Sequence, residues 1–98
     1  MECQACNYKK TPRSEEEIRG LQNRLNRIMG QLGGIKNMID ENRYCGDILT
    51  QLSAAESGLR SLSLIILQRH LETCVIEEIK NGNENVISEA VELIKNFK

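Results

Sequence analysis

Apolar residues recur at alternating intervals of three and four positions along two stretches of this chain. The first stretch runs through Ile18, Leu21, Leu25, Ile28, Leu32, Ile35 and Ile39. The second runs through Ile48, Leu52, Ala55, Leu59, Leu62 and Ile66. This spacing puts one apolar residue per turn on the same side of an α-helix, and it is typical of helices packed in a bundle or coiled coil. The pattern predicts an all-α fold built on two long helices.

Signals for helix ends divide the chain further. Ser14, followed by Glu15, Glu16 and Glu17, is typical of a helix N-cap, so the first helix is expected to start there and to end near Asn42. The second is expected from Tyr44 to about Asn81, where Asn81-Gly82-Asn83 forms a C-cap and turn. A short third helix should follow, and its apolar residues are Val86, Ile87, Ala90, Val91, Ile94 and Phe97.

Residues 1–13 lack this periodicity and are interpreted as a flexible N-terminal tail, which leaves 14–98 as a single domain. A domain this small has a limited core, and oligomerisation is a common remedy. Gly30, Gly33 and Gly34 lower the helix propensity of the first helix and are expected to permit close packing. Cys3 and Cys6 have a metal or redox spacing, but no required role is expected for a lone pair in the tail.

Three potential metal ligands lie on the second predicted helix. His70 and Cys74 are four residues apart, so they point the same way on a helix. Cys45 is separated from His70 by roughly 37 Å at about 1.5 Å rise per residue. One chain therefore cannot close a three-ligand site, but two antiparallel chains that cross near residue 59, among the small residues between Ser53 and Gly58, can. We expect an antiparallel four-helix-bundle homodimer with a metal site split between its subunits.

The donor set indicates which metals fit. Two thiolates and an imidazole suit Cu(I), Zn(II) or Ni(II), and three ligands without a fourth favour Cu(I). The alternative is that Cys45 and Cys74 are structural cysteines and His70 is a helix-surface residue.

Basic residues on the first helix provide a second signal. Arg24 and Arg27 share a polar sector away from the apolar residues, and Lys9, Lys10, Arg13 and Arg19 precede them. Residues 1–43 hold eight Lys and Arg against six Asp and Glu, although the whole chain has a net charge of −1. In a symmetric oligomer these residues would recur and form a broad phosphate-binding face. The alternative is an ordinary solvated helix face.

Several functional classes are disfavoured. The longest apolar run, residues 62–67, is too short to cross a bilayer and contains a Ser. The N-terminus lacks the pattern of a signal peptide, so a cytoplasmic location with mostly reduced thiols is expected. Only three aromatic residues are present, which disfavours base-stacking platforms. No second His or other base pairs with a nucleophile, and no phosphate loop or carboxylate dyad is evident, so an enzyme is not expected.

The motifs together resemble the CsoR/RcnR/FrmR family of metal-sensing bacterial transcriptional repressors. The first helix contributes Arg24-Leu25-Asn26-Arg27-Ile28, Gly30-Gln31-Leu32, Gly34-Ile35 and Met38-Ile39. The second contributes Tyr44-Cys45-Gly46-Asp47-Ile48-Leu49, Gln51-Leu52-Ser53-Ala54 and His70-Leu71-Glu72-Thr73-Cys74. The Cys, His, Cys set is similar to the copper-sensing CsoR branch. Nickel or cobalt sensors generally add an N-terminal His, and formaldehyde sensors lack this second Cys.

The resemblance implies Cu(I) binding by Cys45, His70 and Cys74 between subunits, with Tyr44 and Glu89 hydrogen-bonding around the ligands. It also implies a dimer-of-dimers homotetramer that binds operator DNA without metal and releases it when Cu(I) binds. Arg24 matches a DNA-binding position, whereas another basic position of the family falls on Ser61 here, beside Arg60. Two alternatives stay open: a thiol redox or persulfide sensor, although persulfide sensors lack the His, and a cytosolic copper buffer or metallochaperone.

Overall fold

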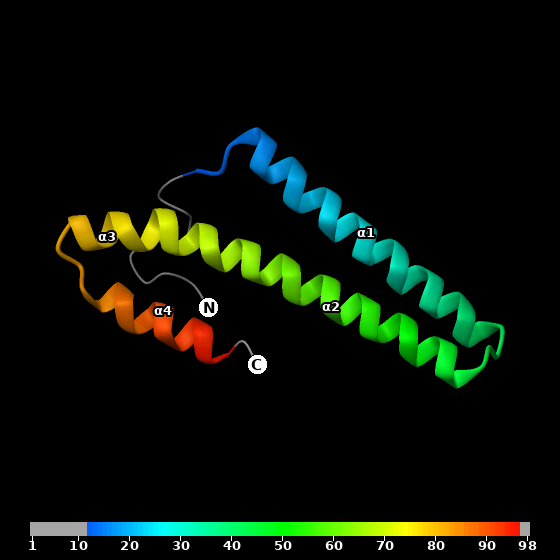
Figure 1. Ribbon diagram of the computed structural model, residues 1–98. Coiled ribbons are helices and arrows are strands. Elements are labelled where there is room, and N and C mark those ends of the chain that lie inside the picture. The colour runs from blue at the N-terminus through cyan, green and yellow to red at the C-terminus, as the bar shows by residue number, and fades with distance from the viewer. Residues whose placement is uncertain (1–11, 97–98) are drawn as a thin grey trace. The chain divides into compact units, whose positions relative to one another are not determined.

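The computed structural model describes residues 12–96, which are helical over most of their length (Figure 1). The elements are α1 (Glu15–Asp40), α2 (Cys45–His70), a π-helical turn η1 (Leu71–Val75), α3 (Ile76–Lys80) and α4 (Asn85–Lys95). The all-α prediction is confirmed, and no strand occurs within residues 12–96. Helix packing separates a hairpin unit, Arg13–Ile65, from a C-terminal unit that contains Ile66–Lys98.

The N-terminal cap of α1 forms at the residue predicted from the sequence. The Ser14 hydroxyl oxygen accepts a hydrogen bond from the Glu17 backbone N–H at 3.1 Å. Three glutamates in the first turn, Glu15, Glu16 and Glu17, stabilise the positive end of the helix dipole. The sequence therefore determines where this helix begins.

A left-handed residue ends α1. Asn42 has φ 53°, a conformation that Asn tolerates better than most residues. The Arg43 N–H donates to the Met38 carbonyl at 3.0 Å and the Asn42 N–H donates to that of Ile39 at 3.1 Å. Both carbonyls belong to the last turn of α1, which lacks helical partners for them. Asp40 is the last helical residue, two positions before the end expected from the sequence.

Only alternate members of the apolar repeat are buried within the hairpin unit. Ile28 and Ile35 of α1 are buried, as are Ala55 and Leu62 of α2. A Cβ built on Gly58 would approach Cγ1 of Ile28 at 3.3 Å, so α1 and α2 come close at this glycine. Gly58, next to the crossing between chains predicted near residue 59, packs against Ile28 of its own chain. We refer to these buried positions as the inner rows.

The remaining members of the repeat form two outer rows. The outer row of α1 consists of Ile18, Leu25, Leu32 and Ile39, which are spaced seven residues apart and between 42% and 58% exposed. Within the hairpin unit, the outer row of α2 consists of Leu52 and Leu59, also seven apart and exposed. Regularly spaced exposed apolar residues mark a surface suited to another protein chain.

The glycines of α1 do not serve the packing expected of them within the chain. A Cβ added at Gly30, Gly33 or Gly34 would meet nothing within 4 Å. Close packing at these positions does not occur within the chain, and close packing against another chain stays a prediction. Sequence alone could not distinguish a glycine in contact from one in open space.

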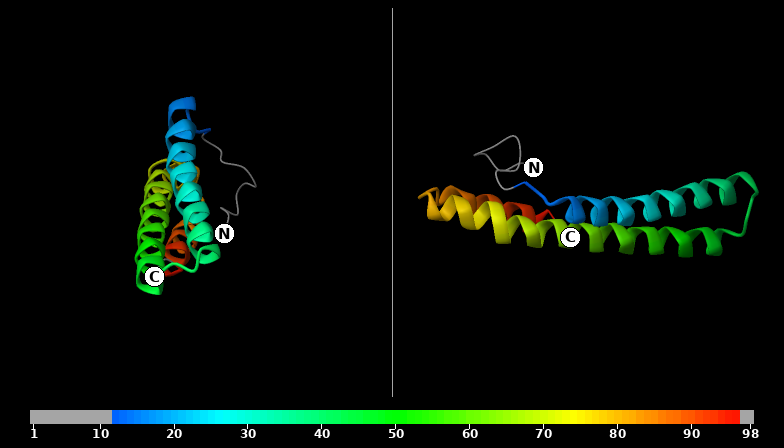
Figure 2. Two further views of the ribbon diagram at one scale, coloured as in Figure 1. Left: turned by 90° about the vertical axis from the view of Figure 1, so that its right-hand side faces the viewer. Right: turned by 90° about the horizontal axis from the view of Figure 1, so that it is seen from above.

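The C-terminal unit has a small core of its own. Val75 of η1 packs with Val86 and Ala90 of α4, and Leu71 lies against this cluster. Figures 1 and 2 show α4 folding back along η1 and α3. The turn between α3 and α4 contains Gly82 at φ 85°, whose N–H donates to the Ile79 carbonyl at 3.0 Å. This is the glycine C-cap predicted from the sequence.

The second predicted helix is nearly correct in extent and differs in its internal geometry. Helical backbone runs from Cys45 to Lys80, but residues 71–75 form a π turn rather than α-helix. Among the residues that the structure describes, no helix is long and apolar enough to cross a membrane.

Candidate metal centre

Cys45 is an exposed thiol at the start of α2. The preceding residue, Tyr44, is also exposed, and its ring lies so close to Gly46 that a Cβ there would overlap it. The Tyr44 carbonyl accepts hydrogen bonds from the N–H groups of Asp47 and Ile48, which begin the helix. The lack of a side chain at Gly46 therefore leaves space for the Tyr44 ring near Cys45.

His70 and Cys74 lie together in the C-terminal unit. His70 is the last residue of α2 and is half-buried, whereas Cys74 lies within η1 and is buried. The Thr73 hydroxyl donates to the Arg69 carbonyl at 2.6 Å, and Arg69 forms an ion pair with Glu72 at 3.2 Å. Both contacts join Arg69, just before His70, to residues that lie between His70 and Cys74.

The π turn η1 was not predicted from the sequence. Such turns arise as local expansions of an α-helix and are frequent at functional sites. A hydroxyl that bonds to the carbonyl four residues earlier commonly bends a helix, so Thr73 was an available signal. It was not sufficient, because Thr50 makes the equivalent bond to the Gly46 carbonyl at 2.9 Å within regular α-helix.

The three predicted ligands are not gathered in a single chain. Cys45 and His70 are the first and last residues of α2, which has 26 residues. Within residues 12–96, no group of three or more His, Cys, Asp or Glu side chains is arranged to hold a metal ion. A site shared between two chains stays a prediction.

Two glutamates near the predicted ligands, Glu89 and Glu78, are at least half-buried. Glu89, predicted to hydrogen-bond around the ligands, is half-buried on α4. Glu78 was not singled out, yet it is only 2% exposed and accepts a hydrogen bond from Asn83 Nδ2 at 2.9 Å. Its spacing of four from Cys74 and three from Val75, which puts it on their side of the helix, was the signal that could have found it.

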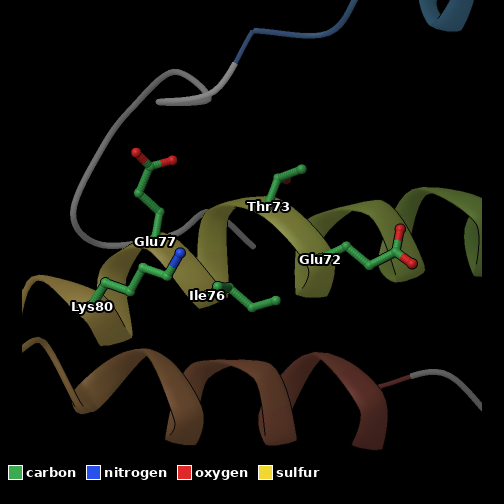
Figure 3. A pocket seen from close by; sticks show the side chains of 5 residues that line it. All are labelled: Glu72, Thr73, Ile76, Glu77 and Lys80. Atoms are coloured by element: carbon green, nitrogen blue, oxygen red, sulfur yellow. The ribbon is translucent and has the colours of Figure 1, made fainter.

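A surface depression of about 260 Å³ lies on the other side of this segment (Figure 3). It is lined by Glu72, Thr73, Ile76, Glu77 and Lys80. Figure 3 shows α4 running along the side of the segment away from Thr73 and Glu77. Cys74 does not line the depression, which is therefore separate from the predicted ligands.

Four arginines predicted to bind DNA are exposed, whereas Arg13, which precedes α1, is half-buried and forms an ion pair with Glu17 at 3.8 Å. Arg19, Arg24 and Arg27 lie on α1, and Arg60 lies on α2. Lys9 and Lys10 fall outside the described residues, as do Cys3 and Cys6. The four arginines belong to the hairpin unit, whereas His70 and Cys74 belong to the C-terminal unit.

Residues 17–96 match the protein family described as metal-sensitive transcriptional repressor. The chain belongs to this family. Membership confirms the resemblance found in the sequence and makes the protein a DNA-binding repressor of an oligomerising family rather than an enzyme.

Individual relatives refine the comparison. The copper-sensing transcriptional repressor CsoR of Bacillus subtilis is 42% identical over 86 residues, which cover 87% of this chain and 85% of CsoR. The crystal structure of the copper-sensing repressor CsoR with Cu(I) from Geobacillus thermodenitrificans has a TM-score of 0.86 at 40% identity and covers 91% of this chain and 94% of its own. The nickel-responsive regulator InrS has a TM-score of 0.73 at 32% identity, with 90% and 100% covered.

Proposed function

We propose that this protein is a cytoplasmic copper-sensing repressor that binds operator DNA in its metal-free form and releases it on binding Cu(I). Cys45 of one chain would hold the ion together with His70 and Cys74 of the partner subunit. The observation that carries the proposal is this donor set, at the start of α2 and at its junction with η1, in a chain 40% identical to a Cu(I)-bound CsoR.

The chemistry of the donors fits Cu(I). Thiolates are soft ligands that select Cu(I), and imidazole binds copper as well. Three donors match a trigonal ion, whereas a structural zinc site normally has four. When bound, Cu(I) would supply bonds that join ligands from two chains. The likeness to nickel-responsive InrS is weaker than that to CsoR, so nickel is kept as a comparison metal in the test.

The outer rows support an antiparallel homodimer. Leu59 follows Cys45 by 14 residues, and Thr73, between His70 and Cys74, follows Leu59 by another 14. Two copies of α2 that cross at Leu59 would therefore bring Cys45 of one near His70 and Cys74 of the other. Exposed Leu52 and Leu59 are available for this contact, whereas Gly58 is occupied by Ile28. The crossing is thus assigned to Leu59, and two such dimers would form the tetramer.

Basic residues of α1 would contact the DNA backbone. Arg19, Arg24 and Arg27 are exposed along one helix, and Arg60 would add to the surface, as would Lys9 and Lys10. Repetition by symmetry multiplies the phosphate contacts although each chain has a net charge of −1.

Metal and DNA binding must be coupled reciprocally, so DNA would weaken Cu(I) binding by the same factor as Cu(I) weakens DNA binding. Tyr44 and Glu89 are the proposed hydrogen-bonding groups around the ligands, which would link the site to the rest of the helices.

A His70→Ala variant tests the assignment. We expect it to bind the promoter DNA of its own gene as the wild type does in a metal-free gel shift, but to need at least about tenfold more Cu(I) for release. Gln51→Ala, at an exposed position of α2, serves as the matched control and should behave as the wild type. Loss of metal-free DNA binding in His70→Ala, or its normal release by copper, contradicts the assigned roles.

X-ray absorption identifies the ligands directly. The Cu(I)-loaded wild type should report two sulfur atoms and one nitrogen, and Ni(II) should not produce DNA release. Wild-type protein that binds Cu(I) but never shifts DNA would indicate a copper buffer. Release by polysulfide, whose sulfane sulfur oxidises the two thiols and leaves as sulfide, with a Cys45–Cys74 crosslink seen by mass spectrometry, would indicate a persulfide sensor.

A further inference from the structure

Glu78 is a charged residue buried in the small core of the C-terminal unit. Among the charged residues within 12–96, Glu78 is the one that is buried, with 2% of its surface exposed. It follows Cys74 by one helical turn, and Cys74 is itself only 1% exposed. Buried carboxylates are costly unless they are hydrogen-bonded, so its partners indicate its role.

Two hydrogen bonds join Glu78 to Asn83. Asn83 Nδ2 donates to Glu78 Oε2 at 2.9 Å, and the Asn83 backbone N–H donates to the Glu78 carbonyl at 2.9 Å. Gly82, at φ 85°, makes the intervening reversal possible. Because α4 begins two residues later at Asn85, this double contact determines where α4 leaves the turn.

The apolar contact that holds α4 in place is small. It consists of Val86 and Ala90 against Val75 and Leu71, while Ile87, Val91 and Ile94 on the same helix are exposed. Elements with few buried apolar contacts open locally at low free energy. The Glu78–Asn83 hydrogen bonds therefore add to the apolar contact in holding α4 in place.

We propose that Glu78 is a positioning residue of the metal centre, which acts through Asn83 to hold α4 against η1 and so to keep the Cys74 thiol covered in the metal-free protein. Cys74, Val75 and Glu78 are buried on one side of the helical segment, and α4 contacts η1. Figure 3 shows α4 on the side away from Thr73 and Glu77. The significance for metal sensing rests on the proposed function: Cys74 would become reachable only when α4 opens, whereas no element of its own chain covers Cys45.

Thiol alkylation of the metal-free, full-length protein measures this covering. Timed iodoacetamide labelling followed by peptide mass spectrometry gives separate rates for Cys45 and Cys74. In the wild type, Cys74 should react at least about tenfold more slowly than Cys45, because a buried thiol reacts only in the opened state. Glu78→Ala and Asn83→Ala should each raise the Cys74 rate about tenfold and leave the Cys45 rate unchanged.

Three further variants make the test specific. Glu78→Gln keeps a side-chain oxygen that can accept from Asn83, so its Cys74 rate should return toward that of the wild type. The Glu78→Ala/Asn83→Ala double variant should react no faster than Glu78→Ala, which already removes the side-chain contact with Asn83. Asn81→Ala, in the same turn and exposed, is the matched control and should have the wild-type rate.

Two results would overturn the proposal: equal rates for the two cysteines in the wild type, or an unchanged Cys74 rate in Asn83→Ala. Asn83→Ala supplies the decisive result even if Glu78→Ala does not fold. All of these rates are measured without metal. Failure of the wild type to bind Cu(I) would therefore refute the proposed function and leave the α4 measurement intact.

Discussion

The hairpin unit and the C-terminal unit use their apolar residues in different ways. In the hairpin, the inner rows are buried, but the outer rows of both long helices are exposed. The C-terminal unit is shorter, yet it encloses a cluster of Val75, Val86 and Ala90 and even a buried carboxylate. The C-terminal unit also exposes apolar residues, such as Ile87, Val91 and Ile94 of α4. The difference is that the exposed apolar residues of the hairpin lie in heptad-spaced rows suited to another chain, whereas the C-terminal unit makes a local core beside Cys74.

The largest effect is expected at the outer row of α2. Leu59→Glu would place a charge in the proposed crossing, where an unpaired buried charge costs about 3 kcal/mol or more. We expect loss of the dimer in sedimentation equilibrium and a clear fall in the melting temperature. Gln51→Glu, at an exposed polar position of the same helix, is the control and should remain assembled. A Leu59→Glu protein that assembles normally would remove Leu59 from the interface.

A neighbouring pair on α4 tests the core of the C-terminal unit. Val86→Ala removes two methyl groups from a residue that is 1% exposed, and it should lower the free energy of unfolding by about 2 kcal/mol. Ile87→Ala, at an exposed neighbour, should cost less than about 0.5 kcal/mol in the same denaturant titration. Equal costs would mean that the outer face of α4 is also buried in the assembly, and the contrast between the units would weaken.

The two left-handed caps allow a matched comparison between the units. Gly82→Ala puts a Cβ at φ 85° and should cost about 1 kcal/mol of unfolding free energy. Asn42→Gly, at the corresponding position after α1, should instead raise stability by a few tenths of a kcal/mol, roughly, because Gly adopts φ 53° without strain. Thermal unfolding of both variants measures the difference, and a neutral Gly82→Ala would contradict the described turn.

The smallest effects distinguish open glycines from packed ones. Gly33→Ala adds a methyl group in open space and should raise stability by about 0.5–1 kcal/mol through helix propensity. Gly58→Ala gains the same propensity, but its Cβ would meet Ile28 at 3.3 Å, so the net gain should vanish or change sign. If Gly33→Ala is destabilising, a contact between chains must occupy that face of α1.

Local sequence signals were reliable for the helix ends. Ser14 caps α1 as its hydroxyl and the three following glutamates predicted, and Gly82 ends α3 as its turn motif predicted. These features depend on residues close in sequence, because their hydrogen bonds join groups within a few residues of each other. The π turn was missed because Thr50 and Thr73 carry the same local bond in different helical geometries, so local sequence could not separate them.

The candidate site also has features that the sequence predicts and features that only the tertiary structure decides. Cys45, His70 and Cys74 could be proposed as ligands from residue type, spacing and family resemblance, because ligand chemistry is a property of the side chains themselves. Their exposure was not predictable: Cys45 is exposed and Cys74 is buried, and only packing against other elements decides this. The same limit concealed Glu78, whose importance comes from burial and from a bond to Asn83.

By itself, then, the sequence determined an all-α chain with two long helices, their caps, membership of a repressor family and a soft donor set. A heptad repeat specifies that apolar residues line one side of a helix, but it does not say which of them a given neighbour covers. Only the tertiary structure decided that Ile28 and Ile35 face the chain's own second helix while Leu25 and Leu32 stay exposed. The physical reason is that each helix has a single apolar face wide enough for two rows, and one antiparallel neighbour can bury only one of them.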